Sequence, residues 1–225
     1  ATAVAPAAPA RPAGLPELVE RRAAMLVEYQ DEAYARRYRS LVDAVAEAER
    51  RVTRGSTALA EAVAHNFHKL MAYKDEYEVA RLYTDGRFLE KLRSTFDGDF
   101  RLNFHLAPPM LARRDPATGQ LLKRSYGPWM LKAMGLLAKL RGLRGTAFDP
   151  FGRTGERRTE RRLIEEYEQT LRSLLPALDI GNLPVAVQLA RLPEKIRGFG
   201  HVKERNLAAA GRERETLLAR FRESK

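Results

Sequence analysis

Apolar residues recur every three to four positions along the N-terminal part of this chain. Between Leu15 and about Val52 this spacing predicts helix, with one interruption near residues 30–33. The apolar positions that carry the pattern are Leu18, Met25, Tyr29, Ala33, Leu41, Val45, Ala48 and Val52. Arg54-Gly55 is expected to end this helical segment.

A second helix is predicted to begin with Ser56 or Thr57 as its cap and to extend to about Tyr83. One apolar stripe of this helix is expected to be buried: Phe67, Leu70, Tyr73, Tyr77 and Ala80. After the turn residues Asp85-Gly86, a shorter helix is expected to end near Phe96.

Residues 100–106, FRLNFHL, alternate between apolar and polar, as in a half-buried strand. Pro108-Pro109 interrupts this pattern. Turn residues at Asp115-Pro116 and Gly119 then separate two short strand-like segments, which predicts a small hairpin or a three-stranded sheet.

The C-terminal half is predicted to be helical. Pro128 suits a first helical turn, and the following residues, WMLKAMGLLAKL, predict a strongly apolar helix that lies in the core. Residues 146–155 predict a loop, after which a charged amphipathic helix is stopped by Pro176. Two further helices are expected at about 182–191 and 201–222. The predicted fold class is therefore mainly α, a helical domain with one small antiparallel β-hairpin or sheet.

Residues 1–14 are almost all Ala and Pro, a composition typical of an extended linker or a loose N-terminus. The length allows one large domain or two small ones, and no internal repeat is visible; residues 15–225 are predicted to form a single, mostly helical domain.

Charge and cysteine content limit the possible functions. The formal net charge is +11, which favours anionic partners such as phosphorylated cofactors, acidic proteins or nucleic acid. The chain has no cysteine, so it cannot ligate an iron–sulfur cluster through thiolates. Its apolar runs are far shorter than the roughly 20 residues of a membrane span, and it has no signal peptide pattern, so we expect a cytoplasmic protein without membrane association.

Four residues would share one face of the predicted second helix and could suggest a metal site: Glu61, His65, His68 and Asp75. The alternative is that these histidines are exposed or satisfied by local hydrogen bonds. They match no recognised ligand motif, so no metal site is predicted.

The segment 192–206, LPEKIRGFGHVKERN, is the strongest candidate for a binding site. Its glycines free the backbone before the last helix, whose first N–H groups, together with basic side chains, suit a phosphate, a carboxylate or an acidic partner. The candidate contact residues are Arg197, His201, Lys203 and Arg205. The alternative is a joint between two helices with solvated charges.

No catalytic motif accompanies this segment. The chain has no Walker loop, dinucleotide-binding fingerprint, GxSxG elbow or HExxH helix, so no catalytic residue is assigned. The basic run ERRTERR at 156–162 is interleaved with Glu156 and Glu160 and lacks stacking aromatics. We therefore do not expect nucleic-acid binding, although an independent basic nucleic-acid-binding protein is one alternative.

Four long segments resemble the C-terminal domain, of undefined role, of the long, fused bacterial indolepyruvate ferredoxin oxidoreductases. They read KLMAYKDEYEVARLYTDGRF, FRLNFHLAPPMLARRDPATG, YGPWMLKAMGLLAKLRGLRGTAFDPFG and LPEKIRGFGHVKERN. The resemblance covers about residues 15–222, and strings of this length and order are specific. The stretches FGRTGERRTERR and HNFH are local variants of that pattern.

The resemblance implies that the chain is an accessory domain of a 2-oxoacid:ferredoxin oxidoreductase. Such a parent enzyme uses thiamine diphosphate, magnesium and iron–sulfur clusters to convert an arylpyruvate to an acyl-CoA, with coenzyme A as co-substrate and ferredoxin as electron acceptor. No cofactor is expected in this chain. The implied partners are the catalytic domains of the parent polypeptide, ferredoxin and further copies of a homo-oligomeric parent. The domain would either dock or steer an anionic partner, or serve as a structural subunit-interface domain.

Overall fold

The computed structural model describes residues 14–98, 101–106, 122–198 and 200–224, with the side chain of His201 excepted. The described residues form nine α-helices, three short 3-10 helices and one two-stranded antiparallel sheet, which confirms the predicted fold class. They separate into two compact units. Of the described residues, unit 1 contains those within 14–28, 32–70 and 165–224, and unit 2 contains those within 29–31 and 71–164. The predicted linker falls almost entirely outside the described residues.

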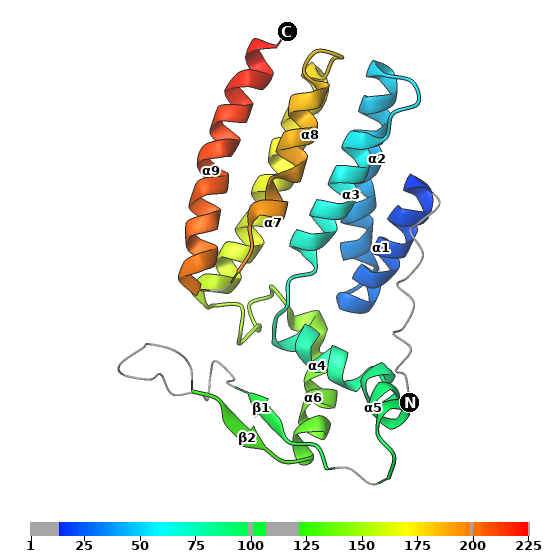
Figure 1. Ribbon diagram of the computed structural model, residues 1–225, viewed down its shortest axis with the longest axis vertical. Helices are drawn as coiled ribbons and strands as arrows, with labels where there is room; N and C mark the ends of the chain where they lie inside the picture. Colours follow the sequence, from blue (N-terminus) through cyan, green and yellow to red (C-terminus); the bar gives the residue numbers. More distant parts are fainter. Residues whose placement is uncertain (1–13, 99–100, 107–121, 199, 225) are drawn as a thin grey trace. The chain divides into compact units, whose positions relative to one another are not determined.

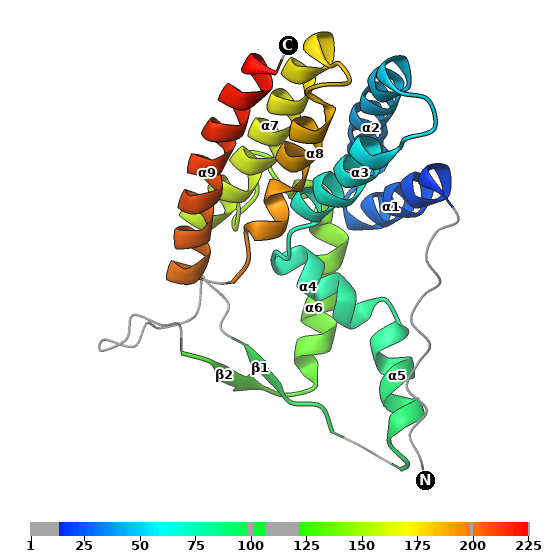
Figure 2. The same cartoon turned by 45° about the horizontal axis from the view of Figure 1, so that its top comes forward.

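Unit 1 is a bundle whose helices lie alongside one another (Figures 1 and 2). Its elements are α1 (Leu15–Tyr29), α2 (Glu32–Val52), α3 (Ala58–Met71), the second half of α7 (Gly155–Leu174), η2 (Leu175–Ala177), α8 (Leu183–Arg191), η3 (Leu192–Lys195) and α9 (Gly200–Glu223). The break predicted near residues 30–33 is confirmed, because α1 ends at Tyr29 and α2 begins at Glu32.

Aromatic side chains connect the helices of unit 1. Tyr38 stacks on Phe67 at a centroid distance of 6.2 Å, and Phe67 stacks on Tyr167 at 5.9 Å. The hydroxyl of Tyr38 donates to the carbonyl of Ala64 at 2.9 Å, and that of Tyr167 donates to the carbonyl of Ala190 at 2.8 Å. The aromatic rings therefore bury apolar area while their polar ends remain satisfied.

A buried carboxylate caps α3 from the neighbouring helix. Glu49 of α2 accepts hydrogen bonds from the backbone N–H of Leu59 at 3.0 Å and of Ala60 at 2.9 Å, and from the hydroxyl of Ser56 at 3.0 Å. Negative charge at a helix N-terminus is favourable because the first N–H groups lack intrahelical partners. The cap expected from Ser56 or Thr57 is thus completed by a residue from another helix.

Unit 2 contains α4 (Glu76–Thr84), α5 (Arg87–Thr95), β1 (Phe104–Leu106), β2 (Arg124–Tyr126), α6 (Trp129–Lys139), η1 (Leu140–Leu143) and the first half of α7. In the sheet, Phe104 pairs with Tyr126 and Leu106 with Arg124. The predicted turn at Asp115-Pro116 and Gly119 lies outside the described residues. The apolar core of the unit is formed by Ala80, Phe104 and Met134.

The prediction of one continuous helix from residue 56 to about Tyr83 is wrong. Helix α3 ends at Met71, and α4 begins after Asp75, whose backbone is extended and whose carboxylate accepts from the N–H of Glu78 at 2.8 Å. This cap stops the preceding helix because an N-cap residue has non-helical backbone angles. Phe67, Leu70, Tyr73, Tyr77 and Ala80 are nevertheless all buried, as predicted.

The prediction that residues 129–140 form a core helix is also wrong in part. Met134 is buried, but Trp129, Leu136 and Leu140 are exposed. Only one face of α6 packs into unit 2, so a helix that is apolar on several sides leaves one apolar side uncovered.

The guanidinium of Arg144 organises the centre of unit 2. It donates to both carboxylate oxygens of Asp75, at 2.5 and 2.9 Å, and to the backbone carbonyl of Tyr29 at 2.6 Å. It also lies 3.7 Å from the centroid of the Tyr29 ring. Burial acts to lower the pKa of Arg144, but the bonds to Asp75 together with the charges of Tyr29, Asp75 and Tyr73 outweigh this and raise it.

A second buried carboxylate shapes the loop that follows. Asp149 accepts from the hydroxyl of Tyr77 at 3.2 Å and from the backbone N–H groups of Gly145 at 2.8 Å and Gly152 at 2.9 Å. A Cβ atom at Gly152 would collide with the carboxylate of Asp149 and the guanidinium of Arg161, so this close approach requires glycine.

Replacing Arg144 with methionine is expected to lower the free energy of unfolding by about 3–5 kcal/mol, because the carboxylate of Asp75 would remain buried without its cation. Urea unfolding followed by circular dichroism measures this change. The control is Arg158→Met, since Arg158 is exposed on α7 and its loss is expected to cost less than about 0.5 kcal/mol. Equal stability of the two variants would contradict the role given to Arg144.

Candidate functional site

The predicted anion-contact residues lie in the turn between η3 and α9 and in the first turns of α9. Arg197 is exposed, and its Nε donates to the carbonyl of Glu194 at 2.7 Å. The carbonyl of Arg197 in turn accepts from the side-chain amide of Asn206 at 2.8 Å. Gly198 has a φ of +96°, which allows the chain to reverse before α9. This half of the segment is therefore an ordered turn between two helices.

The structure adds Lys69 of α3 to this turn. Its ammonium donates to the carbonyl of Pro193 at 2.5 Å. Burial lowers the pKa of Lys69, and the nearby charges of Arg197 and Lys203 lower it further, while Glu194 acts in the opposite direction. The charges of Arg197 and Lys203 thus act directly on Lys69. We call these three residues the basic turn. Lys69 lies 124 positions before Pro193, so no local pattern could indicate that it reaches this turn.

The four predicted residues differ in their placement. Lys203 is half-buried, Arg205 is exposed on α9, and the side chain of His201 lies outside the described residues. An anion-binding role for Arg197, His201, Lys203 and Arg205 stays a prediction. The bonds that Lys69 and Arg197 make to backbone carbonyls also fit the alternative of a structural helix joint.

The residues considered as metal ligands are not arranged as a metal site. Asp75 belongs to the turn before α4 and pairs with Arg144, while Glu61 accepts from the hydroxyl of Thr57 at 2.7 Å. Across the part of the chain that the structure describes, there is no group of three or more His, Asp and Glu residues that could hold a metal ion.

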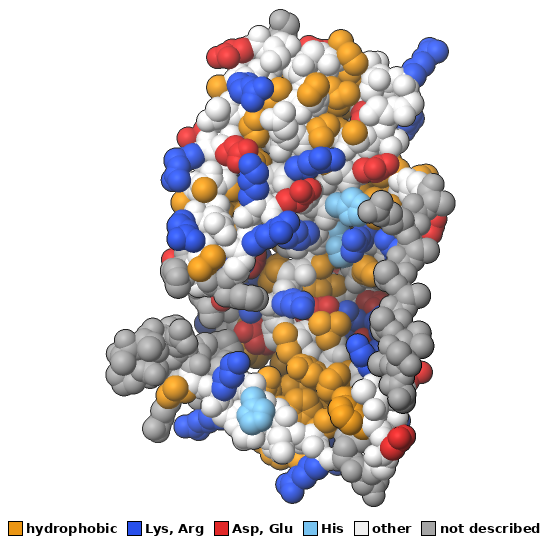
Figure 3. Space-filling view, viewed as in Figure 1, with side chains coloured by type: hydrophobic (Ala, Val, Ile, Leu, Met, Phe, Trp, Pro, Cys, Tyr) orange, Lys and Arg blue, Asp and Glu red, His pale blue; other side chains and the backbone are white. Residues whose placement is uncertain are grey.

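His68 is a buried histidine beside a cation. Its side chain packs edge-on against Tyr38, and its Nδ1 lies 3.5 Å from a guanidinium nitrogen of Arg22. Burial, and then the charges of Arg22 and His65, lower the pKa of His68 to about 3. The imidazole is therefore neutral in the folded protein at pH 7. Figure 3 shows histidines next to Lys and Arg side chains over α1 and α3.

Unit 2 presents the largest share of exposed apolar side chains. Among the described residues, the exposed large hydrophobic side chains of this unit are Leu82, Phe96, Leu122, Trp129, Leu136, Leu140 and Phe148, whereas unit 1 has Met25 and Ile180. Orange side chains gather over α4 and α6 in the space-filling view (Figure 3).

Part of this surface follows one face of α6. Trp129, Ala133 and Leu136 of α6, and Leu140 directly after its last turn, are spaced at i, i+4, i+7 and i+11, which places them along one side, and all four are exposed. We call these four residues the α6 stripe. A different side of α6 packs Met130, Met134 and Leu137 against the core of unit 2. The α6 stripe is thus an uncovered apolar surface of the kind found at protein interfaces.

A model of the family of unknown function DUF6537 matches residues 15–216, so the chain belongs to that family. No curated protein and no solved structure matches the chain. Within the described helices, none is long and apolar enough to cross a membrane.

The buried, neutral state of His68 predicts a pH dependence of stability. The pKa of a histidine is near 6.5 in an unfolded chain, and the pKa of His68 in the folded protein is lower. The contribution of His68 to the free energy of unfolding is therefore complete above pH 6.5 and is lost as the pH falls towards 3. When the pH falls from 6.5 to 4.5, the free energy of unfolding should decrease in both proteins. The decrease is expected to be ~2 kcal/mol smaller in His68→Leu than in the unchanged protein.

Urea unfolding at several pH values measures this difference. His105→Leu is the control, because His105 is exposed on β1, and it should follow the unchanged protein throughout. A His68→Leu variant with the same pH dependence as the unchanged protein would contradict the assignment.

Proposed function

We propose that this member of the DUF6537 family is an accessory domain of a 2-oxoacid:ferredoxin oxidoreductase that oxidatively decarboxylates indolepyruvate or a related arylpyruvate. The support is the resemblance of four long segments, which lie within the residues matched by the family model. In this proposal the parent enzyme forms an acyl-CoA and transfers electrons to ferredoxin. The resemblance implies that thiamine diphosphate, magnesium, the iron–sulfur clusters and the coenzyme A site belong to its other domains, and this chain has no cysteine that could ligate a cluster.

The domain's own task in this proposal is attachment to the catalytic domains or to another protomer of the parent. The observation that supports this role is the α6 stripe, because Trp129 is 60% exposed and Leu136 is 64% exposed. Burying side chains of this size contributes up to about 1.5–3 kcal/mol each. Their spacing along one helix face suits a partner helix or an apolar groove.

A second role rests on a different surface. The basic turn and the net charge of +11 suit electrostatic attraction of an acidic electron carrier such as ferredoxin. Charges of this kind mainly raise the association rate and act less at high salt. Attachment and carrier steering use different residues, so they can be tested separately.

Removal of residues 15–225 from the parent enzyme tests the assignment. We expect the truncated enzyme to lose assembly and both activities, measured as reduction of an artificial dye and of ferredoxin with indolepyruvate and coenzyme A. Loss of ferredoxin reduction alone would favour carrier docking over attachment. Full retention of both activities and of the oligomeric state would overturn the proposed role.

A point variant tests the attachment surface more sharply. Leu136→Asp in the parent enzyme is expected to weaken assembly about tenfold or more, because it places a charge in the centre of an apolar interface. Analytical ultracentrifugation measures this. The matched control is Ile180→Asp, since Ile180 is 68% exposed but belongs to unit 1. If both variants assemble like the unchanged enzyme, the α6 stripe is not the interface.

Carrier steering predicts a salt-dependent effect. Arg197→Ser combined with Arg205→Ser should slow ferredoxin reduction severalfold at low ionic strength and match the unchanged enzyme at high salt, with dye reduction unaffected. Arg158→Ser combined with Arg222→Ser removes the same charge from other exposed positions. Equal rates for both double variants would assign the effect to net charge, not to Arg197 of the basic turn and Arg205 of α9.

A further inference from the structure

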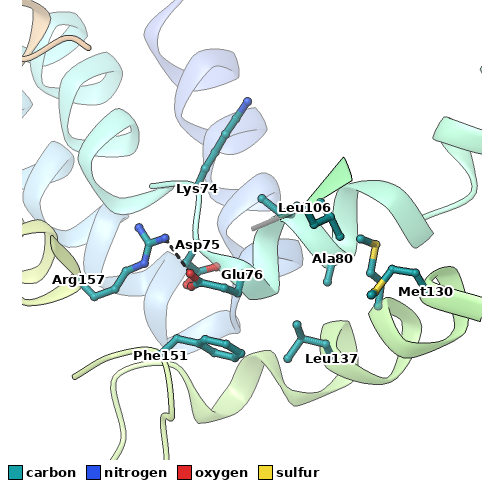
Figure 4. Close-up of a pocket in the computed structure, with 11 residues that line it drawn as sticks. Lys74, Asp75, Glu76, Ala80, Leu106, Met130, Leu137, Phe151 and Arg157 are labelled. Atoms are coloured by element: carbon teal, nitrogen blue, oxygen red, sulfur yellow. Dashed lines mark hydrogen bonds and ion pairs between the residues drawn. The ribbon is translucent and has the colours of Figure 1, made fainter. Parts of the chain in front are cut away.

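Unit 2 contains a pocket of about 270 Å³ between α4 and α6. Most of its lining is apolar: Val79, Ala80, Leu106, Met130, Met134, Leu137 and Phe151. A water molecule in the liquid occupies about 30 Å³, so the pocket is several times larger than one water. Its size suits a molecule with one ring or a short branched chain. Figure 4 shows Ala80, Leu106, Met130 and Leu137 grouped at one end of the pocket.

The other end of the pocket carries a carboxylate. This carboxylate belongs to Glu76, in the first turn of α4. Its Oε1 atom accepts a hydrogen bond from a guanidinium nitrogen of Arg157 at 3.3 Å (Figure 4). Arg157 in turn lies over the ring of Tyr73, with its guanidinium carbon 5.8 Å from the ring centroid. The Oε2 atom of Glu76 is buried and accepts no hydrogen bond from any described residue. A buried acceptor of this kind is costly unless a donor reaches it.

The other charged side chains that line the pocket either have an ion-pair partner or point away from its apolar residues. The carboxylate of Asp75 is held by both arms of the Arg144 guanidinium, and Arg157 is paired with Glu76. The side chain of Lys74 is exposed and extends away from the apolar group (Figure 4). The pocket therefore combines an apolar wall with one available acceptor, the usual layout of a small-molecule site.

We propose that this pocket binds a small aromatic molecule with an N–H donor head, such as an aryl-alkyl ammonium. The ring would lie among the apolar residues, where the sulfur atoms of Met130 and Met134 and the ring of Phe151 favour aromatic contact. The head group would donate to Oε2 of Glu76 and satisfy this acceptor. The site is independent of the α6 stripe and of the basic turn, and it does not depend on the parent enzyme.

Two probes of similar size and opposite head group test the proposal with the full chain. The first is 2-phenylethylammonium and the second is 3-phenylpropionate, and binding is followed by NMR of methyl-labelled Met, Leu and Val. We expect 2-phenylethylammonium to shift Met130 and Met134, with the anion at least tenfold weaker. Tighter binding of the anion, equal binding of both probes, or no shift at these residues would overturn the proposal.

Two neighbouring leucines provide the control for the pocket itself. Leu137 lines the pocket, whereas Leu136 points to solvent on the same helix. Leu137→Phe should fill the pocket and abolish binding, and Leu136→Phe should leave it unchanged. In Glu76→Gln the shape is retained and the charge removed, so affinity for the ammonium should fall about tenfold. Thermal unfolding verifies that each variant is folded, and retained affinity in folded Leu137→Phe and Glu76→Gln would overturn the assignment.

Discussion

The ion pair of Arg144 and Asp75 is the interaction on which the structure of unit 2 depends. The guanidinium of Arg144 donates to the carboxylate of Asp75, which caps α4. It also lies over the ring of Tyr29 and donates to the backbone carbonyl of Tyr29 at the end of α1. Three chain segments, around residues 29, 75 and 144, are thereby fixed by one side chain. A buried charge of this kind is stable only when each of its donors has a partner, so the segments cannot shift independently.

The helix pattern of the sequence predicted most elements because amphipathic spacing is a local property. The predictions of helix ends and of burial failed at two places, for different reasons. Asp75 followed by Glu78 is a capping signal that ends one helix and starts the next, and this signal was available in the sequence. Helix α6 was assigned to the core because it is rich in apolar residues, but composition does not tell which faces a neighbour covers.

The candidate sites were less predictable because they depend on long-range contacts. The basic turn includes Lys69, far from Arg197 in the sequence, and the pocket joins residues from α4, β1, α6 and α7. Composition and glycine spacing predict Arg197 and Lys203 as contacts, whereas the unpaired acceptor at Glu76 results from the packing around it. Local patterns thus indicate which residues carry charge, and packing decides which of them remain available.

The cap that Glu49 provides for α3 also bears on how the bundle forms. It joins positions 10 and 11 residues apart, whereas the ion pair of Arg37 and Glu168 closes a separation of 131 residues. Closing a short loop costs less chain entropy than closing a long one, and such loops close within about 10–100 ns. The α2–α3 hairpin is therefore expected to form early in folding, with α7 docking on it later.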